Sequence, residues 1–162
     1  MKLKKGDKIP QGELFYLGVN KAVEKINTKH LFENQKIIMF GLPGAFTKVC
    51  SAQHLPGFIK NYEETKKKGV SKIICISVND PFVMHAWGET FNVKDKILMV
   101  GDPFCKFIKD IGADVDKSEK GLGIRSSRFA MLVENSIVKE IKEEKDTASC
   151  EITAAENFLK EI

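Results

Sequence analysis

Unbroken apolar runs mark the interior strands of this chain. Residues 36–40 (KIIMF) and 72–78 (KIICISV) are apolar at nearly every position, and residues 97–100 (ILMV) form a third run. Strands of a parallel sheet are covered on both faces, so they carry such continuous runs instead of an alternating pattern. Residues 13–18 (ELFYLG) predict one more short strand. We therefore expect a sheet with a buried centre.

A helix is predicted to begin near Cys50. Its core-facing residues follow one another at spacings of three or four, which is the period of a buried helical stripe, and they are Leu55, Phe58, Ile59 and Tyr62. Pro56 falls inside this helix, and a proline in a helix interior removes a hydrogen bond and predicts a kink.

Capping patterns predict the starts of three more helices. Asp80 and Asp102 each stand directly before a proline, and an aspartate cap followed by proline in the first turn is a common helix opening. The helix after Asp80 should run to about Phe91. Thr153 and Glu156 form the Thr-x-x-Glu pattern of a capping box, which predicts that the last helix begins there.

The order of these elements predicts an α/β fold. Residues 129–133 and 137–141 are strand candidates that flank Glu134-Asn135-Ser136, which indicates a hairpin. Strands alternate with helices over the first two thirds of the chain, and the hairpin and a closing helix follow. A thioredoxin-like sandwich, with a mixed central sheet flanked by helices, fits this order. Without internal repeats or a linker, residues 1–162 are expected to form one domain.

Composition indicates the cellular location that we expect for the protein. The chain has 162 residues, 43% of them hydrophobic, yet no apolar run reaches the roughly 18 residues that a membrane span needs. Its first residues, MKLKKGDKIPQGEL, have no apolar stretch after the lysines, so no secretory signal is expected. A reducing, cytoplasmic location is the default, and an organelle stays open if the chain is a processed form.

Basic and acidic residues are mixed along the chain, which carries a net charge of +4. The densest basic run is Lys66-Lys67-Lys68, directly before Gly69, where cations would favour the negative end of a helix dipole. No aromatic residues are interleaved with these lysines, so they indicate a solvated helix end and not a nucleic-acid surface.

The four cysteines are too far apart to form a familiar paired motif. They are Cys50, Cys75, Cys105 and Cys150. No Cys-x-x-Cys pair is present, so neither a ribbon-type zinc site nor a dithiol motif is expected. Structural disulfides are rare in reducing compartments, so we treat these residues as four separate thiols.

Cys50 stands where a loop turns into a helix, in PGAFTKVCS. The unpaired N–H groups and the positive dipole end of a helix start favour a thiolate over a thiol. Pro43 should stiffen the loop, Gly44 lets the backbone approach closely, and the Thr47 hydroxyl could donate to the sulfur or to a bound oxygen. The ordinary alternative is that Cys50 is an inert, buried packing residue, as most free cysteines are.

The segment PGAFTKVCS resembles the active-site signature PxxxTxxC of the peroxiredoxins, here Pro43, Thr47 and Cys50. With the following HLPGF it is similar to the type II branch, which includes the peroxiredoxin-5 enzymes. The likeness continues through residues 75–87 (CISVNDPFVMHAW) and 121–134 (GLGIRSSRFAMLVE), and so spans nearly the whole chain.

This resemblance implies a thiol peroxidase with four site residues. Cys50 would attack the O–O bond of hydrogen peroxide or an alkyl hydroperoxide and become a sulfenic acid. Thr47 would hydrogen-bond the thiolate and the peroxide, and Pro43 would shield the sulfur. Arg128 matches the family arginine that stabilises the thiolate, although Arg125 is close in sequence. No metal, haem or flavin is implied.

The resemblance leaves the reduction of the sulfenic acid open. Cys75 matches a proposed resolving cysteine of plant type II enzymes, but it stands in a strand that should be buried. Cys150 lies about two residues from the resolving position of animal peroxiredoxin-5 enzymes, while Cys105 resembles nothing catalytic. An external thiol, supplied by glutathione and glutaredoxin or by thioredoxin, needs no second cysteine.

Two other functional classes are compatible with a reactive cysteine. His54 lies four residues after Cys50, which superficially indicates a cysteine hydrolase, but two adjacent turns of one helix align poorly, and the family pattern makes His54 a helix-surface or interface residue. A peroxide sensor or a thioredoxin-like binding module would use the same thiol.

Phe46, Phe82 and Trp87 either pack a homodimer face, as in family dimers, or belong to the core. The resemblance favours a homodimer.

Overall fold

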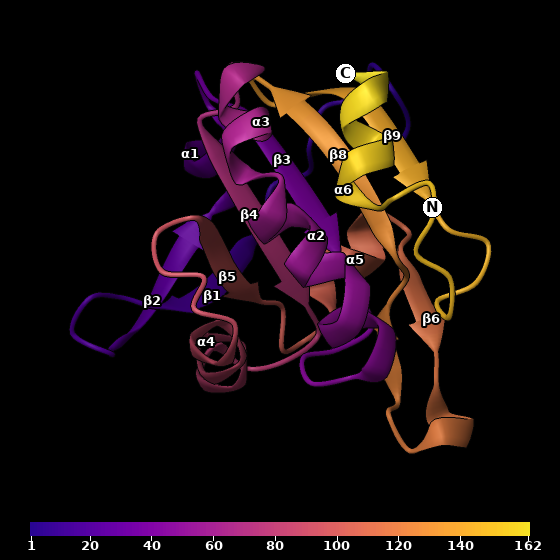
Figure 1. The fold of residues 1–162 in the computed structure, drawn as a ribbon. Coiled ribbons are helices and arrows are strands. Elements are labelled where there is room, and N and C mark those ends of the chain that lie inside the picture. Colours follow the sequence, from indigo (N-terminus) through magenta and orange to yellow (C-terminus); the bar gives the residue numbers. More distant parts are fainter.

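The computed structural model describes residues 1–162 and contains a seven-stranded central sheet of order β2-β1-β5-β4-β3-β8-β9 (Figure 1). Its strands are β1 Glu13–Leu17, β2 Val23–Asn27, β3 Lys36–Gly41, β4 Lys72–Ser77, β5 Ile97–Gly101, β8 Phe129–Glu134 and β9 Ile137–Glu143. β3, β4 and β5 are parallel, whereas β8 pairs antiparallel with β3 and with β9. The sheet is therefore mixed, as the sequence predicts.

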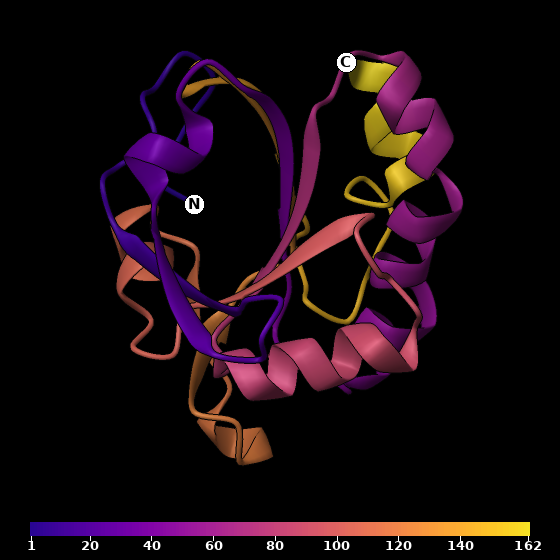
Figure 2. The same cartoon turned by 90° about the vertical axis from the view of Figure 1, so that its left-hand side faces the viewer.

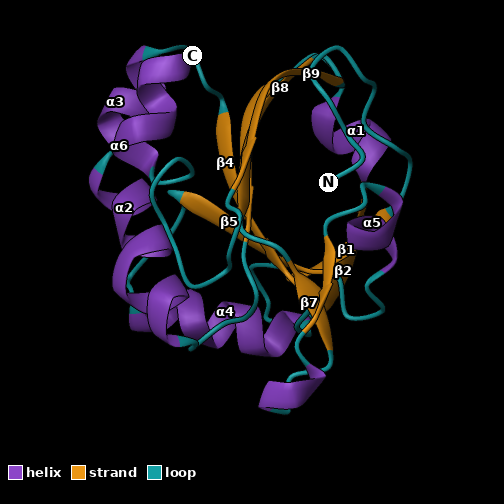
Figure 3. Ribbon diagram, turned by 90° about the vertical axis from the view of Figure 1, so that its right-hand side faces the viewer, coloured by secondary structure: helices purple, strands orange, loops and turns teal.

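Helices cover both faces of the sheet (Figures 2 and 3). They are α1 Thr28–Phe32, α2 Leu55–Lys60, α3 Tyr62–Lys67, α4 Pro81–Thr90, α5 Lys106–Asp110 and α6 Ala155–Phe158. α2, α4 and α6 pack on one face, around Phe40, Phe58 and Trp87. α1 and α5 pack on the other face, around Met39 and Phe129. The two apolar layers explain why β3 and β4 have no polar face.

The helix that follows β3 is irregular where it carries Cys50. Residues 48–60 are helical without interruption, but Cys50–His54 form a π-helical turn in which the Leu55 N–H donates to the Cys50 carbonyl. The irregularity therefore precedes Pro56 and ends where α2 begins. Pro56 lacks an N–H, and its ring would clash with a carbonyl one turn back in a regular helix. A wider turn at this point removes that conflict.

One of the three predicted caps forms as expected. Asp80 caps α4 by accepting from the Val83 N–H at 3.0 Å. The Asp102 cap is wrong in position: α5 begins at Lys106 after Cys105, so Pro103 is not in its first turn. The Asp102 carboxylate still accepts from Lys106 N–H and Ile108 N–H, at 3.0 and 2.8 Å. The capping box at Thr153 is wrong: the N-cap of α6 is Ala154 and makes no side-chain bond. The Thr153 hydroxyl donates instead to the Glu144 carboxylate at 2.9 Å, which removes it from the helix end.

The hairpin between β8 and β9 is confirmed, and its turn shows why it can be so short. Asn135 and Ser136 both have positive φ, at 48° and 66°, which is the backbone of a type I′ turn. β2 and the small hairpin of β6 Asp114–Asp116 and β7 Ile124–Ser126 were not expected. Their sequences are mostly polar, and their residues are largely exposed.

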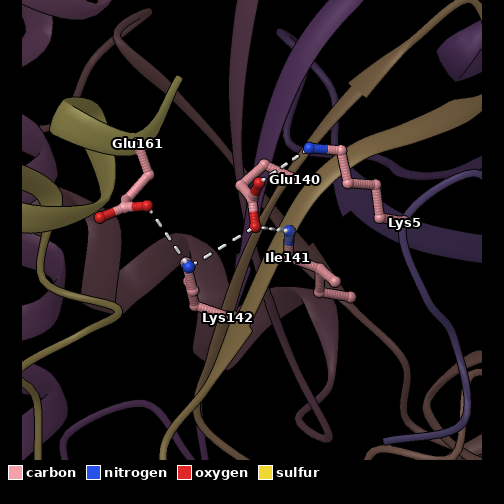
Figure 4. A network of polar contacts seen from close by, with 5 residues as sticks. All are labelled: Lys5, Glu140, Ile141, Lys142 and Glu161. Carbon is pink, nitrogen blue, oxygen red and sulfur yellow. Dashed lines mark hydrogen bonds and ion pairs between the residues drawn. The ribbon is translucent and has the colours of Figure 1, made fainter.

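The C-terminal turn is tied to β9 by charged side chains (Figure 4). Lys142 Nζ lies 3.5 Å from a Glu161 carboxylate oxygen and 3.7 Å from Glu140, which also pairs with Lys5 at 3.3 Å. Ion pairs at a protein surface contribute about 0–1 kcal/mol each. Phe158 of α6 is also buried in the core cluster on this face of the sheet. None of the helices is both long enough and apolar enough to span a membrane.

Candidate active site

Cys50 is completely buried at the start of the helix that follows β3. The first helical bond runs from the Ser51 N–H to the Thr47 carbonyl at 3.0 Å, so Cys50 occupies the first turn. N–H groups in a first turn have no acceptor within the helix, and they form the positive end of its dipole. Cys50 therefore lies at a helix start, as the sequence predicts.

Two side chains fix the loop that leads to Cys50. The Ala45 N–H donates to Asn79 Oδ1 at 3.0 Å, and Arg125 Nη1 donates to the Pro43 carbonyl at 3.3 Å. A Cβ atom on Gly44 would lie 2.9 Å from Arg125 Nη1, so a larger residue would push this end of the arginine side chain away from the loop. Both partners come from distant parts of the chain, so tertiary contacts hold this loop in place beside Cys50.

The Thr47 hydroxyl donates to the Gly44 carbonyl at 2.8 Å and not to the sulfur. Its proton is therefore engaged within the loop. The oxygen keeps lone pairs that can accept a hydrogen bond from another group.

Arg128 reaches Cys50 from the residue that precedes β8. Its Nη2 lies 3.4 Å from Cys50 Sγ, and its side chain is buried with 1% exposure. Nε and Nη2 both donate to the Thr147 carbonyl, at 3.3 and 2.8 Å. A buried guanidinium at this distance stabilises negative charge on the sulfur far more than an exposed one would. Arg125, the other candidate, contacts the loop and not the thiol.

His54 is buried against Arg128, which corrects the expectation that it lies on the helix surface or at an interface. Nδ1 lies 3.1 Å from Arg128 Nη1, and Nε2 lies 3.2 Å from the Thr153 carbonyl. Because a guanidinium only donates, Nδ1 must accept, and Nε2 must carry the proton. Burial, together with the positive charge of Arg128, lowers the pKa of His54 to about 3. A neutral ring with both nitrogens engaged is no general base for Cys50.

The remaining cysteines differ in how accessible they are. Cys75 is fully buried in β4, and burial raises the pKa of its thiol well above the ordinary value, with the nearby Cys50 adding to the effect. Cys105 is buried near the start of α5, and burial also raises its pKa. Cys150 is half-buried in the loop between β9 and α6. Burial raises the pKa of Cys150, and the positive charge of Arg128 offsets only part of that rise.

Comparison with known proteins identifies the family. The model of the Redoxin family matches residues 4–159. Peroxiredoxin-2D of Arabidopsis thaliana is 40% identical over 157 residues, which cover 97% of this chain and 96% of that protein. The chain belongs to the Redoxin family, as a type II peroxiredoxin.

Solved structures agree with this membership. Reduced Prx3 of Vibrio vulnificus in complex with H₂O₂ shares 37% identity and a TM-score of 0.92, with 98% of each chain covered. The antioxidant protein of Plasmodium falciparum, named a 1-Cys peroxiredoxin, shares 32% identity and a TM-score of 0.91 over 99% of this chain and 100% of that one. The present peroxiredoxin is thus a thiol peroxidase with a thioredoxin-like fold.

Sequence reasoning missed three polar residues that shape the site of this peroxiredoxin. His54 was weighed only as a partner of Cys50, and its spacing of four residues was the signal that it shares the cysteine's surroundings. Asn79 could have been noticed as a polar residue directly after a buried strand, where loops gather at one edge of the sheet. Glu144, which binds Thr153, had no signal in the sequence.

Proposed function

We propose that Cys50 is the peroxidatic thiol and that Arg128 is its electrostatic partner. The contact of 3.4 Å between Arg128 Nη2 and Cys50 Sγ carries this proposal. The guanidinium favours the thiolate and then stabilises the negative charge that develops on the departing peroxide oxygen. The first helical turn adds its dipole to the same effect. No other cysteine of the chain has an arginine within hydrogen-bonding distance of its sulfur.

In the proposed step the Cys50 thiolate attacks one oxygen of a hydroperoxide. An S–O bond forms as the O–O bond breaks, and the second oxygen leaves as hydroxide or alkoxide and takes a proton from solvent. The sulfur loses two electrons and becomes a sulfenic acid, while the peroxide is reduced to water or alcohol. These electrons come from the sulfur itself, so we propose that no prosthetic group takes part.

Thr47 and Pro43 are proposed to orient the peroxide and to shield the thiol. Because the Thr47 proton is donated to the Gly44 carbonyl, its oxygen can accept a hydrogen bond from the O–H of the peroxide. Pro43 is buried in the loop held by Arg125, and its ring would exclude bulk water from the sulfur. Water exclusion strengthens the interaction of Arg128 with developing charge.

The proposed substrates are hydrogen peroxide and small alkyl hydroperoxides. Cys50 has no exposed surface, so a small oxidant can reach the sulfur with less rearrangement than a bulky one. The structural relative from Vibrio vulnificus is described in complex with H₂O₂, which supports hydrogen peroxide as one substrate here.

For regeneration we propose an external thiol, from glutathione with glutaredoxin or from thioredoxin. The external thiolate would attack the sulfenic sulfur, form a mixed disulfide and release water; a second thiol would then free Cys50. Cys75 lies in a central strand, so its use as a resolving thiol would require the sheet to open. Cys150 is the better internal candidate, because its loop is half-buried and near Arg128. The relative named a 1-Cys peroxiredoxin supports a route without either.

We further propose that residues 1–162 act as one domain, in the cytoplasm and as a homodimer. Phe46 and Phe82 are 57% and 58% exposed, which suits a dimer face. Trp87 is fully buried, and its Nε1–H donates to the Ser51 hydroxyl at 3.0 Å. It therefore belongs to the core and not to the exposed face.

The test of the proposed function is peroxide consumption with each reductant in turn. Cys50→Ser should abolish turnover with both glutathione/glutaredoxin and thioredoxin. Cys105→Ser, which alters a buried thiol away from Arg128, should retain turnover and serves as the matched control. Peroxide consumption that survives Cys50→Ser would overturn the proposal.

A further inference from the structure

The loop between β9 and α6, residues 145–153, is held at its C-terminal end by one carboxylate oxygen. Glu144 Oε1 accepts from the Glu151 N–H at 2.7 Å, and from the Thr153 N–H and hydroxyl at 2.9 Å each. Thr153 has no exposed surface. Its two donors depend on this oxygen, since a buried donor left without an acceptor is costly.

The same loop supplies acceptors to the two side chains beside the thiol. The Thr147 carbonyl accepts two bonds from Arg128, and the Thr153 carbonyl accepts from His54 Nε2. His54 Nδ1 in turn accepts from Arg128 Nη1. At its other end, the Glu144 N–H donates to the Arg128 carbonyl at 2.9 Å. The contacts therefore close a ring from Glu144 through the loop to Arg128 and back.

This ring couples the position of the loop to the position of the guanidinium. Arg128 has five N–H donors, and the loop carbonyl of Thr147 serves its Nε and Nη2. If the loop moves away, these donors lose their acceptor inside the protein, and His54 loses the carbonyl that fixes its ring. A buried cation in that state turns toward new acceptors, so its contact with Cys50 Sγ is lost.

We propose that Glu144 is a positioning residue for the peroxidase reaction, although it touches neither Cys50 nor the Arg128 guanidinium. It acts by holding residues 145–153 closed over Arg128 and His54. Because Cys150 belongs to this loop, the same carboxylate also restrains that thiol. The inference rests on the proposed roles of Cys50 and Arg128.

The experiment compares the full-length protein with three variants of the acidic pair in this region. Glu144→Leu removes the acceptor oxygen, whereas Glu144→Gln keeps an acceptor carbonyl. Glu151→Gln is the control: it removes a negative charge from the same loop, but the Glu151 side chain is exposed and only its backbone N–H bonds to Glu144. The readouts are the second-order rate of Cys50 oxidation by hydrogen peroxide, the thiolate absorbance near 240 nm at pH 7, and the rate of alkylation of Cys150.

Glu144→Leu should slow Cys50 oxidation about tenfold, which corresponds to roughly 1.4 kcal/mol, lower the thiolate absorbance and speed the alkylation of Cys150. Glu144→Gln should stay within about threefold of the wild type, since its carbonyl can still accept. Glu151→Gln should match the wild type. If Glu144→Leu does not fold, Glu144→Asp replaces it: the charge is kept, but the oxygen lies too far from Thr153, so the same direction of change is expected.

A folded Glu144→Leu or Glu144→Asp protein with wild-type values in all three readouts would overturn the inference. Cys50→Ser measured in parallel distinguishes failure of the proposed function from failure of the positioning role. If Cys50→Ser still consumes peroxide, the proposed function has failed. If Cys50→Ser is inactive while the Glu144 variants resemble the wild type, only the positioning role has failed.

Discussion

Arg128 contacts Cys50 and His54 with different nitrogens of one guanidinium: Nη2 lies 3.4 Å from Cys50 Sγ, and Nη1 lies 3.1 Å from His54 Nδ1. The planar group is thus fixed at a second point while it faces the sulfur. A single point charge could not satisfy both contacts and the Thr147 carbonyl.

Arg128→Lys should therefore lower kcat/KM for hydrogen peroxide by about 100-fold, the usual cost of removing one donor to developing charge. Lysine keeps the charge but cannot bind sulfur, imidazole and carbonyl in one plane. Arg125→Lys is the matched control, because Arg125 contacts the Leu122 and Pro43 carbonyls and not the thiol. Equal losses in both variants, measured by steady-state kinetics, would argue against a special role for Arg128.

His54 predicts a characteristic loss of stability in acid. Its folded-state pKa of about 3 lies below the ordinary value of 6.5. As the pH falls from about 6.5 toward 3, the unfolded chain therefore takes up a proton that the native protein does not, and the free energy of unfolding decreases. His54→Gln keeps an acceptor but does not titrate, so its urea-unfolding free energy should fall less steeply over this range. Parallel curves for the two proteins would contradict a buried neutral His54.

The cysteines outside the helix start predict how the enzyme is regenerated. The double variant Cys75→Ser/Cys150→Ser should retain turnover with glutathione and glutaredoxin, because the external thiol attacks Cys50 directly. A double variant that consumes one equivalent of peroxide and then stops with glutathione and glutaredoxin would show that an internal thiol is required. The single variants would then separate the buried Cys75 from the half-buried Cys150.

The exposed aromatic residues predict an effect on assembly. Phe82→Asp should shift the protein toward a monomer in sedimentation velocity at micromolar concentration, because it places a charge in the proposed apolar face. Phe104→Asp is the control, since Phe104 is 75% exposed but belongs to the turn before α5. A wild-type protein that is already monomeric would remove the homodimer from the account.

The parts of the fold that could be predicted are those in which local pattern and burial agree. β3, β4 and β5 are apolar at successive positions because helices cover both faces, and Asp80 caps its helix as its position before a proline predicts. β2 was not predicted because its residues are mostly polar and lack the apolar pattern of a buried strand. They form a strand because they pair with β1. Such pairing depends on tertiary context and leaves little trace in the sequence.

In the site, the resemblance names Cys50, Thr47, Pro43 and Arg128 as functional residues, which stays a prediction, and it says nothing of how their side chains are held. His54 and Arg128 are 74 residues apart, and no local pattern joins them. The capping box at Thr153 was wrong for the same reason: the distant carboxylate of Glu144 takes the hydroxyl that the local pattern assigns to the helix start. Long-range polar contacts decide both positions, and a single sequence does not record them.

The peroxidatic role of Cys50 is tested by adding one equivalent of hydrogen peroxide to the reduced protein in the presence of dimedone and locating the adduct by mass spectrometry. Dimedone traps sulfenic acid, so we expect one adduct, on the peptide that contains Cys50, and none in Cys50→Ser. An adduct that forms first on Cys75, Cys105 or Cys150, with Cys50 still reduced, would contradict this role.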